Sequence, residues 1–220
     1  MKVVAPLLRR ITGDEKHAPS AFSTLDVLWV LYDGVLNVAP RRLDDPERDR
    51  FLLSKGHGVA GYYAVLAAKG FLPEDWLDDL AGPESPLGHH PDRLRVPGVE
   101  ISSGSLGHGL GLAVGTALAL RAQGLLKPRV YVMLGDAELD EGSNHEAIAY
   151  AGALGLDSLT AIVIDNHSAS YAPPGGLGTL FTVHGWTSST VDGRDHSAIR
   201  SALLPRGPHA VIATVEKKGS

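Results

Sequence analysis

The chain has 220 residues, of which 44% are hydrophobic, a formal net charge of -5 and no cysteine. This length suffices for one domain with a buried core, the acidic balance argues against non-specific binding to nucleic acid, and the missing thiols exclude disulfides, iron–sulfur clusters and thiolate zinc sites. Residues 1–10 lack the apolar segment of a signal peptide and residues 106–120 are too short and too rich in glycine to span a bilayer, so we expect a soluble cytoplasmic protein.

Apolar residues at helical spacing predict several helices in the first half of the chain. We expect these helices over residues 18–36, 58–69, 73–80 and 106–123. The proline-rich stretch 82–100 predicts a long loop before the last of them, and loops of that length in compact domains are often functional.

Strands and helices alternate in the second half of the chain. We expect strands over residues 129–134, 160–165, 187–191 and 210–215, and helices over residues 143–154 and 196–204. This alternation is typical of domains in which helices cover a parallel sheet. The predicted fold class is therefore α/β, with helices on both faces of the sheet.

The acidic stretch GDAELDEG, residues 135–142, directly follows an apolar strand. Neighbouring carboxylates repel one another unless water or a cation relieves the repulsion. One interpretation is a solvated turn at the start of a helix, where the helix dipole favours acidic residues. The other interpretation is a metal site.

The metal interpretation depends on where the next strand ends, at Asp165 and Asn166. Because adjacent parallel strands bring their carboxyl ends to one edge of a sheet, Asp136 and Asn166 would lie close together. Carboxylate and amide oxygens suit Mg²⁺ or Ca²⁺ rather than zinc, and Mg²⁺ usually also binds a phosphate. The spacing alone leaves both interpretations open.

Five segments resemble, in order, the N-terminal, diphosphate-binding half of transketolases. They are KHAPSAFSTLDVLWVLYDGVL (16–36), LSKGHGVAGYYAVLAAKGFLP (53–73), LGHHPDRLRVPGVEISSGSLGHGLGLAVGTALA (87–119), the Gly-Asp and Asp-Asn pairs at 135–136 and 165–166, and HGWTSSTVDGRDHSAIRSAL (184–203). The resemblance covers nearly the whole chain. It implies a thiamine diphosphate-binding fold, with residues 1–220 forming a single diphosphate-binding domain.

The resemblance also implies a role for each position that matches a functional residue of the family. Asp136 and Asn166 would ligate Mg²⁺ (or Ca²⁺) by their side chains, and Ser168 by its backbone carbonyl. The residues implied to contact thiamine diphosphate are Gly104, Leu106, Gly135, Asp136, Ala137 and Asn166. The implied catalytic residues are His17 and His57, which would line the cofactor–substrate channel, His90, which would contact the donor ketose, and Glu141, which would link two active sites across a subunit interface. The three histidines would transfer protons to and from sugar hydroxyls.

Three single residues and one loop depart from the family pattern. Ala137 replaces the second glycine of Gly-Asp-Gly, His108 replaces a glutamine, and His89 stands where glycine is usual. The loop after Asn166 also differs from the family's loop. We expect the metal geometry to be retained, whereas these departures leave the substrate-binding residues undetermined.

The implied reaction is the transfer of a two-carbon ketol unit from a ketose or ketose phosphate to an aldehyde. In single-chain members of the family, further domains bind the pyrimidine ring of the cofactor and carry the glutamate that activates it, and no segment here matches them. The resemblance therefore implies a second, C-terminal transketolase-like subunit. The expected assembly is a heterotetramer with two copies of each chain, active only when both are present.

Two other classes of protein stay open. One is a degenerate transketolase half without catalytic activity, acting as a docking or regulatory module. The change at Ala137 favours this alternative slightly, whereas the retained Asp136, Asn166, Glu141 and three histidines count against it. The other is a metal-dependent hydrolase that uses His89, His90, Asp136 and His145, although their spacing matches no recognised ligand motif.

Overall fold

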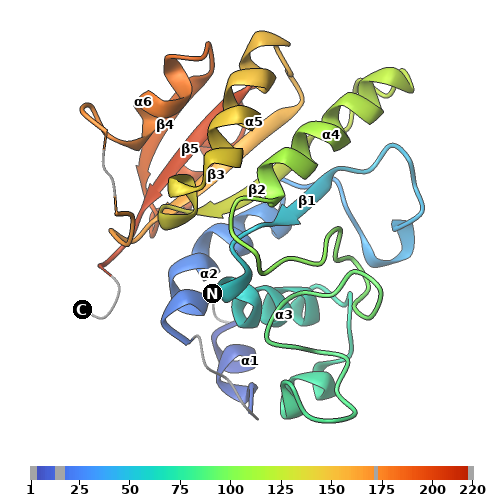
Figure 1. Ribbon diagram of the computed structural model, residues 1–220. Helices are drawn as coiled ribbons and strands as arrows, with labels where there is room; N and C mark the ends of the chain where they lie inside the picture. Colours follow the sequence, from blue (N-terminus) through green and yellow to red (C-terminus); the bar gives the residue numbers. More distant parts are fainter. Residues whose placement is uncertain (1–3, 13–17, 171–172, 218–220) are drawn as a thin grey trace.

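The computed structural model describes residues 4–12, 18–170 and 173–217. Within these residues the chain forms a five-stranded parallel sheet in the order β1-β2-β3-β5-β4 (Figure 1). The strands are β1 (Arg50–Leu53), β2 (Val130–Gly135), β3 (Leu159–Asp165), β4 (Thr187–Asp192) and β5 (His209–Thr214). The predicted parallel α/β fold is confirmed.

Alternating side chains along β1, β2, β3 and β5 pack into two separate cores. In β2, Tyr131 and Met133 belong to one core, whereas Val130, Val132 and Leu134 belong to the other. Such alternation follows from the period of two along a strand. Because both faces of β2 are apolar, this strand reads as a continuous apolar run rather than an alternating pattern.

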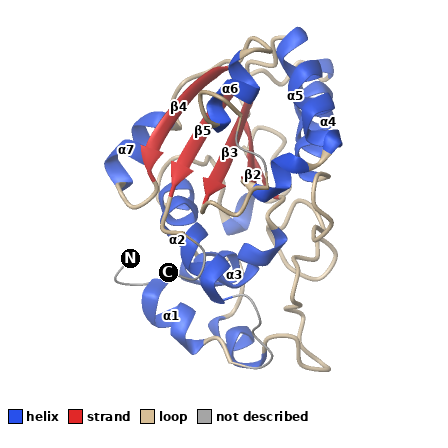
Figure 2. Cartoon of the chain, turned by 60° about the vertical axis from the view of Figure 1, so that its left-hand side comes forward, coloured by secondary structure: helices blue, strands red, loops and turns tan. Residues whose placement is uncertain are grey.

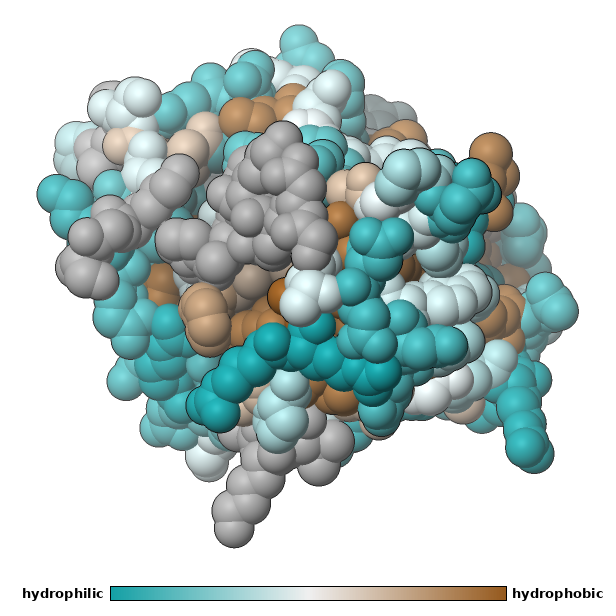
Figure 3. All heavy atoms as spheres, turned by 90° about the horizontal axis from the view of Figure 1, so that it is seen from below, coloured by the Kyte–Doolittle hydropathy of each residue, from teal (hydrophilic) through white to brown (hydrophobic). Residues whose placement is uncertain are grey.

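Helices cover both faces of the sheet (Figures 1 and 2). On one face lie α1 (Val4–Arg10), α2 (Ala18–Tyr32), α3 (Val59–Ala68) and α7 (His196–Ala202), and on the other lie α4 (Gly109–Ala122), α5 (Gly142–Ala153) and α6 (Leu177–Thr182). Viewed from below, hydrophilic side chains cover most of the described surface, with apolar residues in patches between them (Figure 3). No helix in the described ranges has the length and apolar character needed to cross a bilayer.

The observed elements differ from the predicted ones at several ends. The first predicted helix stops at Tyr32, the helix expected at 73–80 is a 3-10 helix (Glu74–Asp79), and the one expected from residue 106 begins only at Gly109. This last delay has a backbone cause, because Gly104 and Gly107 have positive φ angles of 150° and 85°. The sequence did not predict α1, α6 or β1, nor three 3-10 helices (Pro40–Arg42, Gly56–Gly58 and Ala137–Asp140).

Strand β1 positions one wall of the site described below. It pairs with β2 from Arg50 opposite Val130 to Leu53 opposite Met133. The amides of Ser54 and Lys55 then both donate to the carbonyl oxygen of Met133, at 2.9 and 3.0 Å. The residues that follow β1 are thereby fixed beside the carboxyl end of β2.

Candidate functional site

The carboxyl ends of β2 and β3 meet at one edge of the sheet, as predicted. Asp136 follows β2, is only 1% exposed, and donates its amide to the carbonyl oxygen of Ile164 at 3.1 Å. Its carboxylate accepts hydrogen bonds from the amides of Ser168 (2.5 Å) and Ala169 (3.0 Å) and from the hydroxyl of Ser168 (2.6 Å). The Asp136 side chain therefore holds the turn after β3 against the end of β2.

Asn166 supplies an acceptor that the described residues leave unused. It is 3% exposed, and its Oδ1 is buried without a hydrogen-bond partner among them. Since a buried polar atom without a partner costs free energy, such an oxygen points to a bound donor or cation. The next residue, His167, has a φ angle of 56°, in the left-handed region that non-glycine residues rarely adopt.

A cavity of about 230 Å³ opens beside these residues. Its walls come from the start of α2, the end of β1, the loop before α4, and the ends of β2 and β3. The lining residues are Ser20, Lys55, His57, Leu106, Gly135, Ala137, Glu138, Asn166 and Ser168.

The acidic stretch after β2 divides into a buried and an exposed part. Asp136 and Glu138 are buried, whereas Asp140 and Glu141 are exposed. Burial raises the pKa of Glu138, and hydrogen bonds from Ser54 and two backbone amides act in the opposite direction, as does the charge of nearby Lys55. The stretch is thus more than a solvated turn.

The carboxylate of Asp136 and the side-chain oxygen of Asn166 are two buried acceptor groups, and each follows one of the two neighbouring strands β2 and β3. A small number of protein oxygens suits Mg²⁺, because this ion usually binds one or two protein carboxylates and fills its other coordination positions with water and phosphate oxygens. Across the described ranges, no three His, Asp or Glu side chains come together in a way that could hold a metal ion. The hydrolase hypothesis needed such a cluster of His89, His90, Asp136 and His145, and it gains no support.

A second pocket lies next to the first, and a pair of histidines connects the two. The rings of His57 and His90 lie 5.7 Å apart between centroids, with their planes at 33°. Close packing here requires glycine, because a Cβ on Gly56 would lie 2.9 Å from His90 Nδ1 and one on Gly104 would lie 3.1 Å from His90 Cγ.

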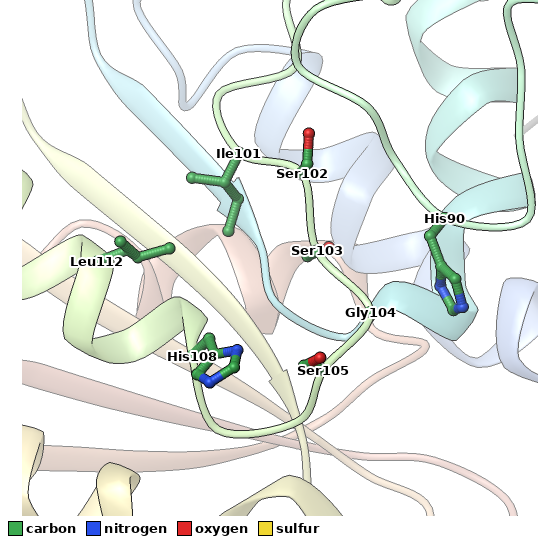
Figure 4. Close-up of a pocket in the computed structure, with 8 residues that line it drawn as sticks. All are labelled: His90, Ile101, Ser102, Ser103, Gly104, Ser105, His108 and Leu112. Carbon is green, nitrogen blue, oxygen red and sulfur yellow. The ribbon is translucent and has the colours of Figure 1, made fainter.

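This second pocket has a volume of about 490 Å³. In Figure 4 the loop 101–105 runs between His90 and the start of α4. The pocket is lined by His90, Ile101, Ser102, Ser103, Gly104, Ser105, His108 and Leu112. His57 lines the first cavity and His90 the second, so the histidine pair lies between them.

Most of the residues predicted to form the site lie in or next to the two pockets. Leu106 is 44% exposed and lines the first cavity, so it is not an ordinary core residue, whereas Gly104 lines the second pocket. Glu141 is exposed at the start of α5 and does not line either pocket. His17 lies outside the described residues.

Three lining residues of the first cavity were missed by the sequence analysis: Ser20, Lys55 and Glu138. Lys55 directly follows β1, and because that strand was not predicted, its carboxyl end could not be recognised as part of the site. Glu138 was visible in the acidic stretch, but its partners Ser54 and Gly107 lie far away in the sequence.

Comparison with known proteins gives a consistent result. Residues 12–204 match the family described as transketolase, thiamine diphosphate binding domain. The chain is 39% identical over 212 residues to an apulose-4-phosphate transketolase subunit from Actinobacillus succinogenes, covering 91% of this chain and 76% of that protein. It is 54% identical over 217 residues to a protein of Rhodococcoides fascians named Ferredoxin fas2, covering 97% of this chain and 71% of that protein.

Among solved structures, a transketolase from Leishmania mexicana superimposes with a TM-score of 0.80 at 27% sequence identity. The superposition covers 96% of this chain and 36% of the transketolase. The chain thus spans about a third of the length of that enzyme. Although a relative is named a ferredoxin, this chain has no cysteine to ligate an iron–sulfur cluster.

Proposed function

Because the chain belongs to the transketolase family, as its thiamine diphosphate-binding domain, we propose that it is the N-terminal subunit of a two-chain transketolase. The enzyme would transfer a two-carbon ketol unit from a ketose or ketose phosphate to an aldehyde. The name of the Actinobacillus relative supports the split arrangement, because it describes one subunit of a transketolase and this chain covers 76% of that protein. The expected partner is a pyrimidine-binding, C-terminal transketolase-like subunit, in a heterotetramer with two copies of each chain.

The buried oxygens at the ends of β2 and β3 are the observation that carries the cofactor proposal. The carboxylate of Asp136 and the unpartnered Oδ1 of Asn166 fit a divalent cation, with the backbone carbonyl of Ser168 as a third ligand. We assign this position to Mg²⁺ (or Ca²⁺) that holds the diphosphate group. When bound, thiamine diphosphate supplies the electron sink for breaking and forming the carbon–carbon bond.

The other residues of the cavity would bind the cofactor and exclude water. Leu106, Gly135 and Ala137 would contact it from the loop before α4 and from the end of β2, and Gly104 would do so from the neighbouring pocket. Lys55 lines the same cavity and brings a positive charge to a site for a polyanion.

The histidine pair would act on the substrate rather than on the metal. Imidazoles can both accept and donate protons, so His57 and His90, together with His17, would transfer protons to and from sugar hydroxyls. Glu141, exposed at the start of α5, would link the two active sites across the subunit interface.

The test is an assay of ketose cleavage with thiamine diphosphate and Mg²⁺ for this chain, for a candidate second subunit and for their mixture. The expected result is activity only in the mixture, with a mass in solution that fits two copies of each chain. A mixture that associates but reacts with no ketose would instead support the docking or regulatory module. Full turnover by this chain alone would overturn the split-enzyme proposal.

A further inference from the structure

A single buried carboxylate, that of Glu138, joins the three segments that form most of the cofactor cavity. We propose that Glu138 is a positioning residue that fixes the spacing of these segments, and with it the affinity of the chain for the metal-bound diphosphate. The inference rests on the proposed function. It concerns a residue to which neither the family resemblance nor the reaction described above gives a role.

Both oxygens of the Glu138 carboxylate are occupied by donors of the protein. Oε1 accepts the amide of Gly107 at 3.1 Å and the hydroxyl of Ser54, and Oε2 accepts the amide of Gly135 at 3.3 Å. The side chain is 1% exposed. The described contacts of the Glu138 carboxylate connect three separate backbone segments, which is why we assign the residue to positioning and not to catalysis.

The three donors stand directly beside residues that line the cavity. Ser54 precedes Lys55, Gly107 follows Leu106, and Gly135 is itself a lining residue that precedes Asp136. These donors come from the end of β1, the loop before α4 and the end of β2. A shift of the carboxylate would therefore move three walls of the cavity relative to one another.

The same network extends to the first turns of α4 and α5. The hydroxyl oxygen of Ser54 also accepts the amide of Gly109, the first residue of α4, at 3.1 Å. The backbone carbonyl of Glu138 accepts the side-chain amide of Asn144 in α5 at 2.5 Å. Both helices that flank the cavity on this face of the sheet are thus connected to the one residue.

The requirement for a carboxylate follows from the donors it meets. An ionised carboxylate accepts at both oxygens, whereas a glutamine of nearly the same shape offers one acceptor oxygen and one NH₂ donor. In Glu138→Gln, the NH₂ group would face either the Gly135 amide or the Gly107 amide and Ser54. At least one segment would lose its hydrogen bond while the volume of the core stays the same.

Asp49→Asn is a matched control at the opposite end of the sheet. Asp49 is likewise buried, and its carboxylate likewise accepts two backbone amides, those of Asn37 at 2.8 Å and Arg129 at 2.7 Å. Replacing it with asparagine causes the same chemical change. None of its partners lines the cavity at the carboxyl ends of the strands.

The experiment is calorimetric titration of the full chain, by itself and with its second subunit, with thiamine diphosphate in the presence of Mg²⁺. We expect Glu138→Gln to lose about 10–100-fold in affinity, as is typical when a residue behind a ligand set is replaced. Asp49→Asn should bind like the wild type although its melting temperature falls. In Glu138→Gln, the amide NMR signals of Gly107 and Gly135 should shift, and in Asp49→Asn they should not.

Each result bears on one of the two proposals. Equal affinity of the wild type and Glu138→Gln would overturn the inference alone, whereas a wild type that binds no thiamine diphosphate under either condition would remove the proposed function and the inference with it. If Glu138→Gln does not fold, Ser54→Ala removes one of the three donors and should still weaken binding several-fold. Unchanged affinity in a folded Ser54→Ala variant would then count against the positioning role.

Discussion

The two ends of the parallel sheet both bury acidic and polar groups, yet they use them differently. At the amino end, Asp49 accepts two backbone amides, and the Arg129 side chain donates to the carbonyl of Leu204 and to the hydroxyl of Thr160. At the carboxyl end, Asp136 fixes one turn, but the neighbouring Asn166 oxygen has no partner among the described residues and its side chain lines a cavity.

An unpaired buried atom does not by itself distinguish the two ends. Arg129 Nε and His209 Nε2 at the amino end are also buried and lack a partner within the described part of the chain. Those two residues do not line the cavity, and neither does Asn144, whose Oδ1 is a buried acceptor without a partner among the described residues, whereas Asn166 carries an unpartnered acceptor and lines the cavity. An unpaired buried acceptor therefore indicates a ligand site where its residue also lines a cavity, as Asn166 does.

The largest expected effect comes from removing the anionic group at the carboxyl end. Asp136→Asn should lower the affinity for thiamine diphosphate in the presence of Mg²⁺ by more than the roughly 10–100-fold that the loss of a residue behind the ligands costs. The reason is that a divalent cation between protein and phosphates needs its carboxylate ligand. Calorimetry on a variant whose circular dichroism matches the wild type gives the answer, and an unchanged affinity would reject the metal assignment.

At the amino end, the equivalent change should affect stability and leave binding alone. Asp49→Asn leaves one of two buried amides without an acceptor, which costs about 1–3 kcal/mol of unfolding free energy. Urea denaturation measures this loss, and the affinity for thiamine diphosphate should equal that of the wild type. A fall in affinity as large as that of Asp136→Asn would mean that the two ends are not functionally separate.

The strands of the sheet differ in how well the sequence predicts them. β2 and β3 are buried apolar runs, so their existence, their parallel pairing and the meeting of their carboxyl ends could all be predicted. β1 has only four residues, begins with Arg50 and lies at the sheet edge, so no periodicity marked it. Because β1 was not predicted, Lys55, which follows it by two residues, was not recognised as part of the site either.

Other parts of the site depend on contacts that no local pattern records. Glu138 lies 84 positions from Ser54 and 31 from Gly107, and only the fold brings their atoms together. The proximity of His57 and His90 likewise depends on glycines at 56 and 104 that leave room for an imidazole. The resemblance to transketolases indicated the histidines, but not Glu138, which also lines the cavity.

The pH dependence of the unfolding free energy tests whether the buried groups at the amino end stabilise the fold. His209 is buried beside Thr187, with 2.7 Å between His209 Nδ1 and the threonine hydroxyl, and burial lowers its pKa from the ordinary value. The folded state therefore keeps this imidazole neutral, while the unfolded state takes up a proton below about pH 6.5. Its contribution to stability is complete above that pH and is lost as the pH falls toward the folded-state pKa.

His209→Gln removes this titration. The difference in unfolding free energy between the wild type and the variant should narrow by up to about 1.4 kcal/mol per pH unit below pH 6.5, because one proton is involved. Urea denaturation at about pH 7.5 and about pH 5.5 gives the two differences, and groups common to both proteins cancel. A difference that is independent of pH would show that His209 does not couple folding to protonation.

The smallest expected effect concerns the family departure at Ala137. This residue begins the 3-10 helix Ala137–Asp140, and its φ angle is not among the positive values found at Ala81 and His167, so an alanine fits the backbone without strain. Its side chain lines the cavity. Ala137→Gly should keep the affinity for thiamine diphosphate or improve it by a few-fold, since a methyl group leaves the wall, and should cost about 0.5–1 kcal/mol of stability through added backbone freedom.

Ala119→Gly, on the exposed side of α4, is the control for this change. It should cost up to about 1 kcal/mol of stability, the usual difference between glycine and alanine in a helix, with no change in affinity. Comparing the two variants separates the effect of the cavity wall from that of glycine itself. A marked loss of affinity in Ala137→Gly alone would mean that the methyl group shapes the turn after Asp136 for binding, so that the departure at this position supports the site.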